Sequence, residues 1–466
     1  MAGWDPIRKL VAEEIAQSAG EGCDVTGFAG RLAAAQTDVE VMGVYEGLKK
    51  LRPMEGYPYV EPDDLDAIMA EAPKGRAGVL ARIKEAFAGK GEDEVRERIR
   101  GAWVSRCVGC ALGKPLETKG FMYTLDGSMG CDNAYKWFKG ADAYPVAGYV
   151  PAESRAEALY GLRVNDVGSL RGRIECMEQD DDVMYTVYGL LMMERHNGSF
   201  DRWDVGRMWH RLLPYGNVCV SETQAYLNFA NVTSHTEERP ADFGDRAEYV
   251  RRHLNPMREG VGARIRADSY AYAAAGDPEL AATLAYRDAT FSCTRNGVYA
   301  AMMAAAMISA AFATDDPREA VEAGLAFVPE RSRLCEAVRL AVSYAEEADG
   351  QMGLLRKVWA AFNRYPCVHA VNNTALCAAA LVYGRGDYDL TLSTAVLGGW
   401  DTDCNGATVG SVLGAMLSEG GVPVKWKAPL NDTLYAGLIG FHPISIRECA
   451  DRGFGTWRRL RSGRAS

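Results

Sequence analysis

Gly398-Gly-Trp-Asp-Thr-Asp-Cys-Asn-Gly406 is the most informative stretch of this 466-residue chain. Asp401 and Asp403 lie two residues apart in a turn flanked by glycines. Carboxylate oxygens are the ligands that Mg²⁺, Mn²⁺ and Ca²⁺ prefer, and glycines let the backbone approach a ligand closely. An Asx turn is the alternative interpretation of the same residues. The stretch therefore predicts either a capped turn or half of a metal site.

A stripe of small residues follows this turn. Gly406, Gly410, Gly414 and Ser418 recur every four residues, which places them on one face of a helix. Exposed glycines would weaken that helix by roughly 1 kcal/mol each, so another element must pack against them. Because the side chains at the contact set the distance between helix axes, the stripe predicts a very close helix–helix contact.

Helical patterns also dominate the rest of the chain. Residues 94–113 form one amphipathic segment that ends at glycine, and Asp316-Pro317 is typical of a helix start. The apolar run Val298 to Ala313 spans about 16 residues, short of the roughly 20 that a membrane span needs. Alternating, strand-like runs are few and short. These patterns predict an all-α protein with a buried alanine-rich helix.

A second acidic cluster, Glu178-Gln-Asp-Asp-Asp182, precedes an apolar helical stripe at Val183, Val187, Leu190 and Leu191. Capping explains one carboxylate and the helix dipole favours a second. A third adjacent acid repels the others unless a cation lies among them. Two such clusters, each opening a buried helix, favour metal binding over capping alone.

Composition excludes several classes of protein. The chain is 48% hydrophobic and carries a net charge of −10, which argues against disorder and against coating nucleic acid or anionic lipid. The first residues lack the apolar core of an export signal, and the 12 cysteines are scattered. We therefore expect a cytoplasmic protein with reduced cysteines. Cys107 and Cys110 form a lone CxxC and are interpreted as small buried residues.

Three motifs, in order along the chain, resemble the ADP-ribosylglycohydrolase family. They are Gly109-Cys-Ala-Leu-Gly-Lys-Pro-Leu-Glu117, Gln179-Asp-Asp-Asp182 and the Gly398–Ala407 stretch. Together they span roughly Trp103 to Glu419. The resemblance implies an all-α, orthogonal multi-helix bundle of the ADP-ribosylglycohydrolase type. It also implies two divalent cations, with Mg²⁺ expected and Mn²⁺ or Ca²⁺ as alternatives.

The resemblance further implies roles for single residues. Glu117 and Asp181 are the expected catalytic groups. The expected metal ligands are Asp180, Asp181, Asp182, Asp401, Asp403 and Cys404. The chain departs from the common pattern at Cys110, where Asp is frequent, at Cys404, where Thr is frequent, and at Cys293, where Ser-His is expected. A thiol is a poor ligand for a hard ion, so one metal site is expected to be weaker.

Further residues are candidates for substrate binding. In the segment from Asn255 to Asp268, arginine forks and glycine amides suit a diphosphate, and a solvated helix end explains the same residues. His369 and the adjacent asparagines precede an apolar helix, where capping is the alternative role. The full set of substrate candidates is Gly113, Gly262, Arg266, Asp268, His369, Asn372, Gly399 and Trp400.

The predicted organisation has three parts: a helical N-terminal extension (1–92), a catalytic domain (93–456) and a loose basic tail (457–466). Residues 116–171 are rich in Gly, Tyr, Asp and Pro, which is typical of a functional lid or a surface insertion.

The leading functional hypothesis is metal-dependent hydrolysis of the bond between ADP-ribose, or a related ribosyl group, and its acceptor. One alternative is an N-glycoside hydrolase for a small nucleoside or NAD-derived metabolite. The other is a non-catalytic protein that keeps the fold. The expected partner is a nucleotide-like substrate, without nucleic acid or membrane.

Overall fold

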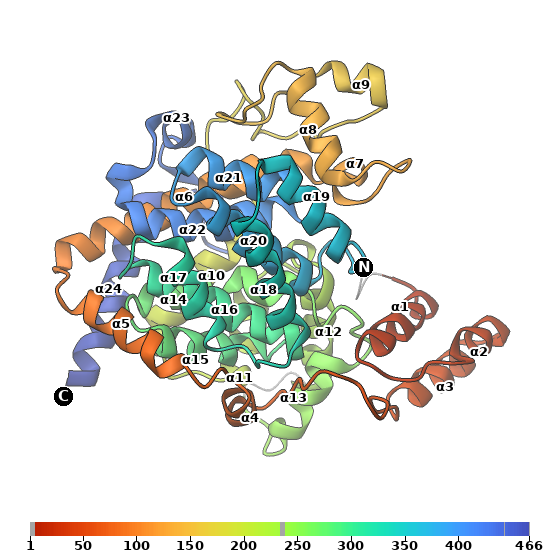
Figure 1. Cartoon of the computed structure of the whole chain (residues 1–466). Helices are drawn as coiled ribbons and strands as arrows, with labels where there is room; N and C mark the ends of the chain where they lie inside the picture. Colours follow the sequence, from red (N-terminus) through yellow and green to blue (C-terminus); the bar gives the residue numbers. More distant parts are fainter. Residues whose placement is uncertain (1–4, 234–237, 442, 466) are drawn as a thin grey trace.

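The computed structural model describes residues 5–233, 238–441 and 443–465, and these residues are predominantly helical (Figure 1). Within them, sheet is limited to two short antiparallel strands, β1 (Thr433–Leu434) and β2 (Ile444–Ser445). The all-α prediction is confirmed.

The helices occur in the following order. The N-terminal segment contributes α1 (Ile7–Gly20), α2 (Phe28–Ala34), α3 (Asp38–Leu48), α4 (Leu65–Ala70) and α5 (Arg76–Ala88). Then come α6 (Glu92–Gly113), the 3₁₀ turn η1 (Lys114–Leu116), α7 (Lys119–Met122), α8 (Gly130–Gly140), α9 (Arg155–Tyr160), α10 (Asp181–His196), α11 (Arg202–Leu212) and η2 (Tyr215–Asn217). The middle of the chain forms α12 (Val220–Thr233), α13 (Phe243–Arg252), η3 (Val261–Arg266), α14 (Asp268–Ala273), α15 (Pro278–Ala289), α16 (Arg295–Ala311), α17 (Pro317–Leu325) and α18 (Arg333–Glu346). The last elements are α19 (Gln351–Phe362), α20 (Ala370–Gly384), α21 (Tyr388–Leu397), α22 (Thr402–Gly421), α23 (Val424–Lys427), η4 (Ala428–Leu430) and α24 (Ile446–Ala465).

Helices α6 and α22 pack with their backbones in contact, as the small-residue stripe predicts. A Cβ atom added at Gly109 would lie 2.0 Å from the Gly406 carbonyl oxygen, and one at Gly410 would lie 2.2 Å from that of Ser105. At Gly414 the nearest atom would be the Gly101 oxygen, at 2.1 Å. The stripe therefore fixes the start of α22 beside the end of α6.

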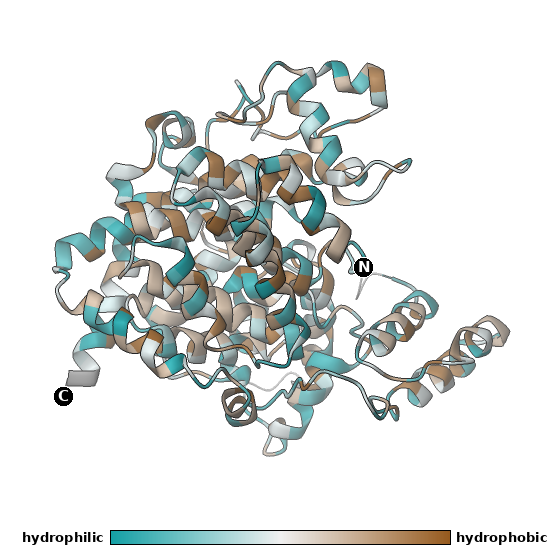
Figure 2. Cartoon of the chain, in the orientation of Figure 1, coloured by the Kyte–Doolittle hydropathy of each residue, from teal (hydrophilic) through white to brown (hydrophobic). Residues whose placement is uncertain are grey.

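The core lies in the middle of the bundle. Helix α16, which holds the alanine-rich run, is buried along almost its whole length, and α20 is buried almost as completely. Figure 2 shows hydrophobic residues concentrated in these central helices and hydrophilic residues more frequent on the outer helices and loops. Asp316 caps α17 by accepting a hydrogen bond from the Arg318 amide, as predicted. No helix in the described residues is long and apolar enough to span a membrane.

The C-terminal segment differs from the sequence expectation. Residues 457–465 are not a loose tail: they form the last turns of α24, where Trp457 and Leu460 are buried. Tertiary packing of these two apolar side chains outweighs the repulsion among the nearby arginines. Residues 116–171 contain three short helices, α7 to α9, between irregular stretches.

The N-terminal segment packs on the bundle through buried ion pairs. Helices α1 to α3 share a small hydrophobic cluster of their own. The link to the bundle is Arg258, whose guanidinium lies 2.7 Å from Glu14 and 2.9 Å from Glu21, both in the N-terminal segment. Because Arg258 is almost fully buried, removing these acids would leave an unpaired charge in the interior.

The close helix contact gives a stability prediction. Gly410→Ala forces a methyl group against the α6 backbone and should lower the free energy of unfolding by about 3 kcal/mol. The matched control is Gly30→Ala, at an exposed site in α2 with open space around the added atom. This control should raise stability by about 0.5 kcal/mol or more, because alanine favours helix. Urea unfolding measures both variants, and equal midpoints would contradict the proposed contact.

Candidate metal centre and adjoining cavity

The two acidic clusters meet at one place in the structure. Cys110, Asp180, Asp182 and Asp403 each offer one donor atom, and these four atoms lie within 4.8 Å of one another. Asp401, Asp403 and Cys404 form a second group with the same spacing. Asp403 belongs to both groups, so the two groups adjoin. Runs that are far apart in the sequence thus form one candidate site for two ions.

The fold brings the clusters together in two ways. The α6–α22 contact places the first turn of α22 against the end of α6, where the Thr402 hydroxyl donates to the Gly113 carbonyl (2.8 Å). Asn373, in the first turn of α20, accepts hydrogen bonds from the Asp401 amide (3.3 Å) and from the Asn405 side chain (2.8 Å). Asn373 therefore holds the turn that carries Asp401.

The backbone before Asp401 is strained. Gly399 and Trp400 both have positive φ, at 73° and 60°. Such a conformation costs little for glycine but is unfavourable for tryptophan. The stacked ring of Trp359, 4.7 Å from that of Trp400, helps to hold it in place.

Burial and mutual repulsion raise the pKa of the acids in this group. Burial is the first cause and the neighbouring carboxylates the second for Asp181, Glu117 and Asp403, whose pKa values lie well above the usual range. The pKa of Asp401 is raised to about 6, chiefly by burial. Clustered, buried carboxylates of this kind are stabilised by cations.

The basic side chains nearby neutralise only part of this charge. Arg106 lies 2.9 Å from Asp182 and 2.9 Å from Asp268, and Lys114 lies 3.0 Å from Asp180. The second carboxylate oxygen of Asp182 is buried, and no residue in the described ranges donates a hydrogen bond to it. An orphaned carboxylate oxygen beside other acids fits a divalent cation.

Two thiols belong to the donor groups. Cys404 was an expected ligand, whereas Cys110 was interpreted as a small buried residue and its place among the acids was not predicted. Burial, followed by the charge of nearby aspartates, raises the pKa of both thiols well above the usual range. Both are therefore poorer donors for a hard ion than an aspartate or a hydroxyl.

The two expected catalytic acids border the donor groups. Glu117 contributes to neither group, but its carboxyl shares a hydrogen bond with that of Asp403. Asp181 is half-buried, and the charges of Asp180, Asp182 and Asp403 act on it. Both therefore lie beside the candidate ions.

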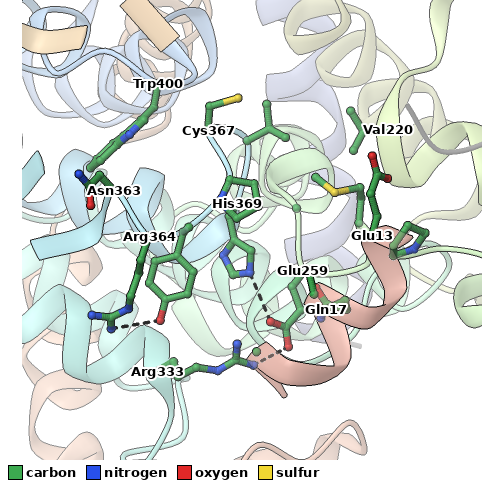
Figure 3. Close-up of a pocket in the computed structure, with 18 of the residues that line it drawn as sticks. Glu13, Gln17, Val220, Glu259, Arg333, Asn363, Arg364, Cys367, His369 and Trp400 are labelled. Atoms are coloured by element: carbon green, nitrogen blue, oxygen red, sulfur yellow. Dashed lines mark hydrogen bonds and ion pairs between the residues drawn. The ribbon is translucent and has the colours of Figure 1, made fainter. Parts of the chain in front are cut away.

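A cavity of about 930 Å³ is linked to the acids through the Trp400–Asp401 segment, although none of the clustered acids lines it (Figure 3). Trp400, the residue before Asp401, is part of its wall, and so is His369. The His369 ring stacks on Tyr365 with centroids 4.8 Å apart and lies 3.4 Å from Glu259. Its other ring nitrogen accepts the Val371 amide and so caps α20, the alternative role considered from sequence.

The other substrate candidates lie elsewhere. Gly113 lies against the Thr402 backbone, where a Cβ atom would be 2.2 Å away, and Gly262 lies equally close to the Glu222 side chain. Arg266 forms a buried ion pair with Glu222 and Asp288, and Asp268 pairs with Arg106. Asn372 is buried and donates to the Pro366 carbonyl, and Gly399 packs against Trp359. These residues occupy packing and ion-pair positions around the site.

Comparison with known proteins identifies a family that this chain matches. Residues 91–457 match the family model described as ADP-ribosylglycohydrolase. One solved structure, an ADP-ribosylglycohydrolase-related protein complex, aligns with 79% of this chain and 99% of its own at 18% identity, with a TM-score of 0.45. No curated protein matches the chain.

The donor set predicts stabilisation by metal. Mg²⁺ or Mn²⁺ at about 100 times its dissociation constant should stabilise the folded chain by about 2.7 kcal/mol. Asp403→Asn alters the residue shared by both donor groups and should remove most of the effect, whereas Asp166→Asn at an exposed site should not. Calorimetric unfolding with and without metal measures this. A midpoint that does not respond to either ion would contradict the site.

The thiol in the second donor group gives a separate prediction. Cys404→Thr replaces a soft donor with a hard one of similar size and should increase the affinity for Mg²⁺ relative to Cd²⁺. Competitive titration with the two ions measures the ratio. An unchanged ratio would show that residue 404 does not reach an ion.

Proposed function

Because the chain belongs to the ADP-ribosylglycohydrolase family, we propose that it is a metal-dependent hydrolase acting on a ribosyl glycosidic bond. The bond joins ADP-ribose, or a related ribosyl group, to its acceptor. The observation that carries this proposal is the convergence of Asp180, Asp182, Asp401 and Asp403. Trp400, the residue before Asp401, lies in the wall of a cavity of substrate size.

The residues that would hold two divalent cations are Asp180, Asp182, Asp401 and Asp403, with the thiols Cys110 and Cys404 as weaker ligands. Mg²⁺ is the expected ion. When bound, such ions orient vicinal hydroxyls and lower the pKa of water.

Glu117 is proposed as the proton-transfer group. It lies beside Asp403 but contributes to neither donor group, so its carboxyl is available for substrate or water. Its backbone is fixed because the Asn165 side chain donates to the Glu117 carbonyl at 3.0 Å. A carboxyl in this place protonates the leaving group or accepts a proton from water during glycoside cleavage.

Asp181 is proposed as the second catalytic acid. Cleavage of a glycosidic bond passes through an oxocarbenium-like state, in which positive charge develops on the sugar. Asp181 stands next to the ligand residues and is only half-buried, so its carboxylate is placed to stabilise that charge.

The activity is tested with a panel of ADP-ribosylated amino acids and peptides, NAD and nucleosides, with products identified by mass spectrometry. Chelation should abolish product formation. Glu117→Gln should lower kcat by about 10²- to 10⁴-fold, because it removes the proton-transfer group but keeps its shape. Glu85→Gln, at an exposed site in α5, is the matched control and should leave kcat unchanged.

Two outcomes would contradict the proposal. Hydrolysis that persists after thorough chelation would rule out the metal-dependent mechanism. A chain that binds ADP-ribose but yields no product from any compound in the panel would favour the non-catalytic alternative.

A further inference from the structure

Part of the cavity wall comes from outside the segment that matches the family. Glu13 and Gln17 reach the cavity from α1, and Tyr57 and Tyr59 reach it from the segment that follows α3. All four precede residue 91, where the family match begins. Figure 3 shows α1 bordering the cavity, with Glu13 and Gln17 on the ribbon. The N-terminal segment is therefore part of the site as well as of the fold.

Helix α1 is held rigidly in this position. Glu14 and Glu21 are seven residues apart, on one face, and both pair with the buried Arg258. Glu13, Gln17 and Gly20 lie on the neighbouring face, which is turned to the cavity. The buried ion pairs with Arg258 on one face of α1 thus determine which side chains its neighbouring face turns toward the cavity.

The second piece of this wall is fixed as well. The Tyr57 hydroxyl donates to the Gly20 carbonyl (3.0 Å), and the Tyr59 hydroxyl donates to Glu336 in α18 (3.2 Å). Glu61 then pairs with Arg333, which also lines the cavity, at 2.7 Å. Tyr57 and Tyr59 are therefore held as a preformed aromatic surface.

Aromatic side chains also line the rest of the cavity. The stacked pair Tyr365–His369 and the stacked pair Trp359–Trp400 both belong to its lining. These side chains favour a ligand with a planar aromatic ring, because that ring can stack on them and gain binding energy even when it is uncharged.

Several charged groups in this lining are neutralised by ion pairs, whereas Arg364 hydrogen-bonds to neutral oxygens, the Tyr365 hydroxyl and the Ala361 carbonyl. Arg333 pairs with both Glu61 and Glu259, and Glu259 also lies 3.4 Å from His369. Lys9 pairs with Asp5. A neutral ring is therefore a better ligand for the interior of the cavity than a strongly charged group.

The cavity is large enough for such a ring, and its wall includes the residue that precedes Asp401. The volume of about 930 Å³ is in the range of small-molecule sites, typically about 300–1,000 Å³. Trp400 in the wall adjoins Asp401, and the Asp401 charge contributes to the raised pKa of Cys367, another wall residue. A base in the cavity and a ribose at the acids are the two ends of one nucleoside.

We propose that the N-terminal segment is a specificity wall, whose aromatic side chains bind the base of a nucleoside-like substrate in this cavity. This inference rests on the proposed function for the reaction itself. The binding of the base depends only on the cavity.

Binding of adenosine to the full-length chain, measured by calorimetry, tests the wall without requiring turnover. Tyr59→Ala should weaken adenosine binding about tenfold, from loss of one stacking surface. Tyr59→Phe keeps the ring and loses only the hydroxyl bond to Glu336, so it should bind like the wild type. If Tyr59→Phe weakens binding as much as Tyr59→Ala does, the ring does not contact the base and the proposal fails.

Gln17→Ala tests the α1 side of the wall. It should also weaken adenosine binding, whereas Gln36→Ala, an exposed glutamine of the same segment that does not line the cavity, should have no effect. Equal affinity in the Gln17 and Gln36 variants would overturn a role for α1 in ligand contact.

A metal-site variant separates this inference from the proposed function. Asp401→Asn should abolish hydrolysis, and in the Asp401→Asn background Tyr59→Ala should still weaken adenosine binding about tenfold relative to Asp401→Asn alone. If no compound is hydrolysed while adenosine binding still depends on Tyr59, the proposed reaction is wrong and the proposed role of the N-terminal segment is supported. If ADP-ribosylated proteins are hydrolysed faster than free nucleosides and the Tyr59 and Gln17 variants keep that rate, the reaction stands and the wall is refuted.

Discussion

The backbone contact between α6 and α22 is the constraint on which the site depends. Glycines on both helices remove every side chain from the contact, so the two axes approach until carbonyl oxygens touch the opposite backbone. This contact orients the first turn of α22, where Asp403 lies, toward the end of α6, which carries Cys110 and leads to Glu117. A wider spacing between these helices would separate the donor groups.

Buried ion pairs between arginines and acids also fix the positions of side chains in the interior. Arg106 forms ion pairs with Asp182 and Asp268, and Arg266 forms ion pairs with Glu222 and Asp288. These buried arginines fix the positions of the acids that they contact. Arg258 serves the same purpose at the N-terminal segment. Breaking a buried pair is costly because it leaves the partner charged and desolvated. The cavity wall and the donor groups are therefore preformed.

Local rules predicted the parts of this structure that depend on neighbours in the sequence. The Asp316 cap, a cap within the acidic run before α10 (Asp180 in the structure), the buried alanine-rich helix and the glycine stripe all follow from periodicity and side-chain chemistry. The positions of Cys110 and Lys114 beside the acids, the capping of the Asp401 turn by Asn373 and the contribution of α1 to the cavity come from tertiary packing. No pattern within one segment signals them. The terminal helical turns were missed because the arginines obscured two buried apolar residues.

The structure implies that acids from two runs far apart in the sequence bind divalent cations between them. A crystal structure of the full chain grown with Mn²⁺, with anomalous scattering recorded at the manganese edge, tests it most directly. The account predicts anomalous peaks among Asp180, Asp182, Asp401 and Asp403, with Glu117 at their border. Manganese bound only at surface carboxylates, with the buried acids instead hydrogen-bonded to one another, would contradict it.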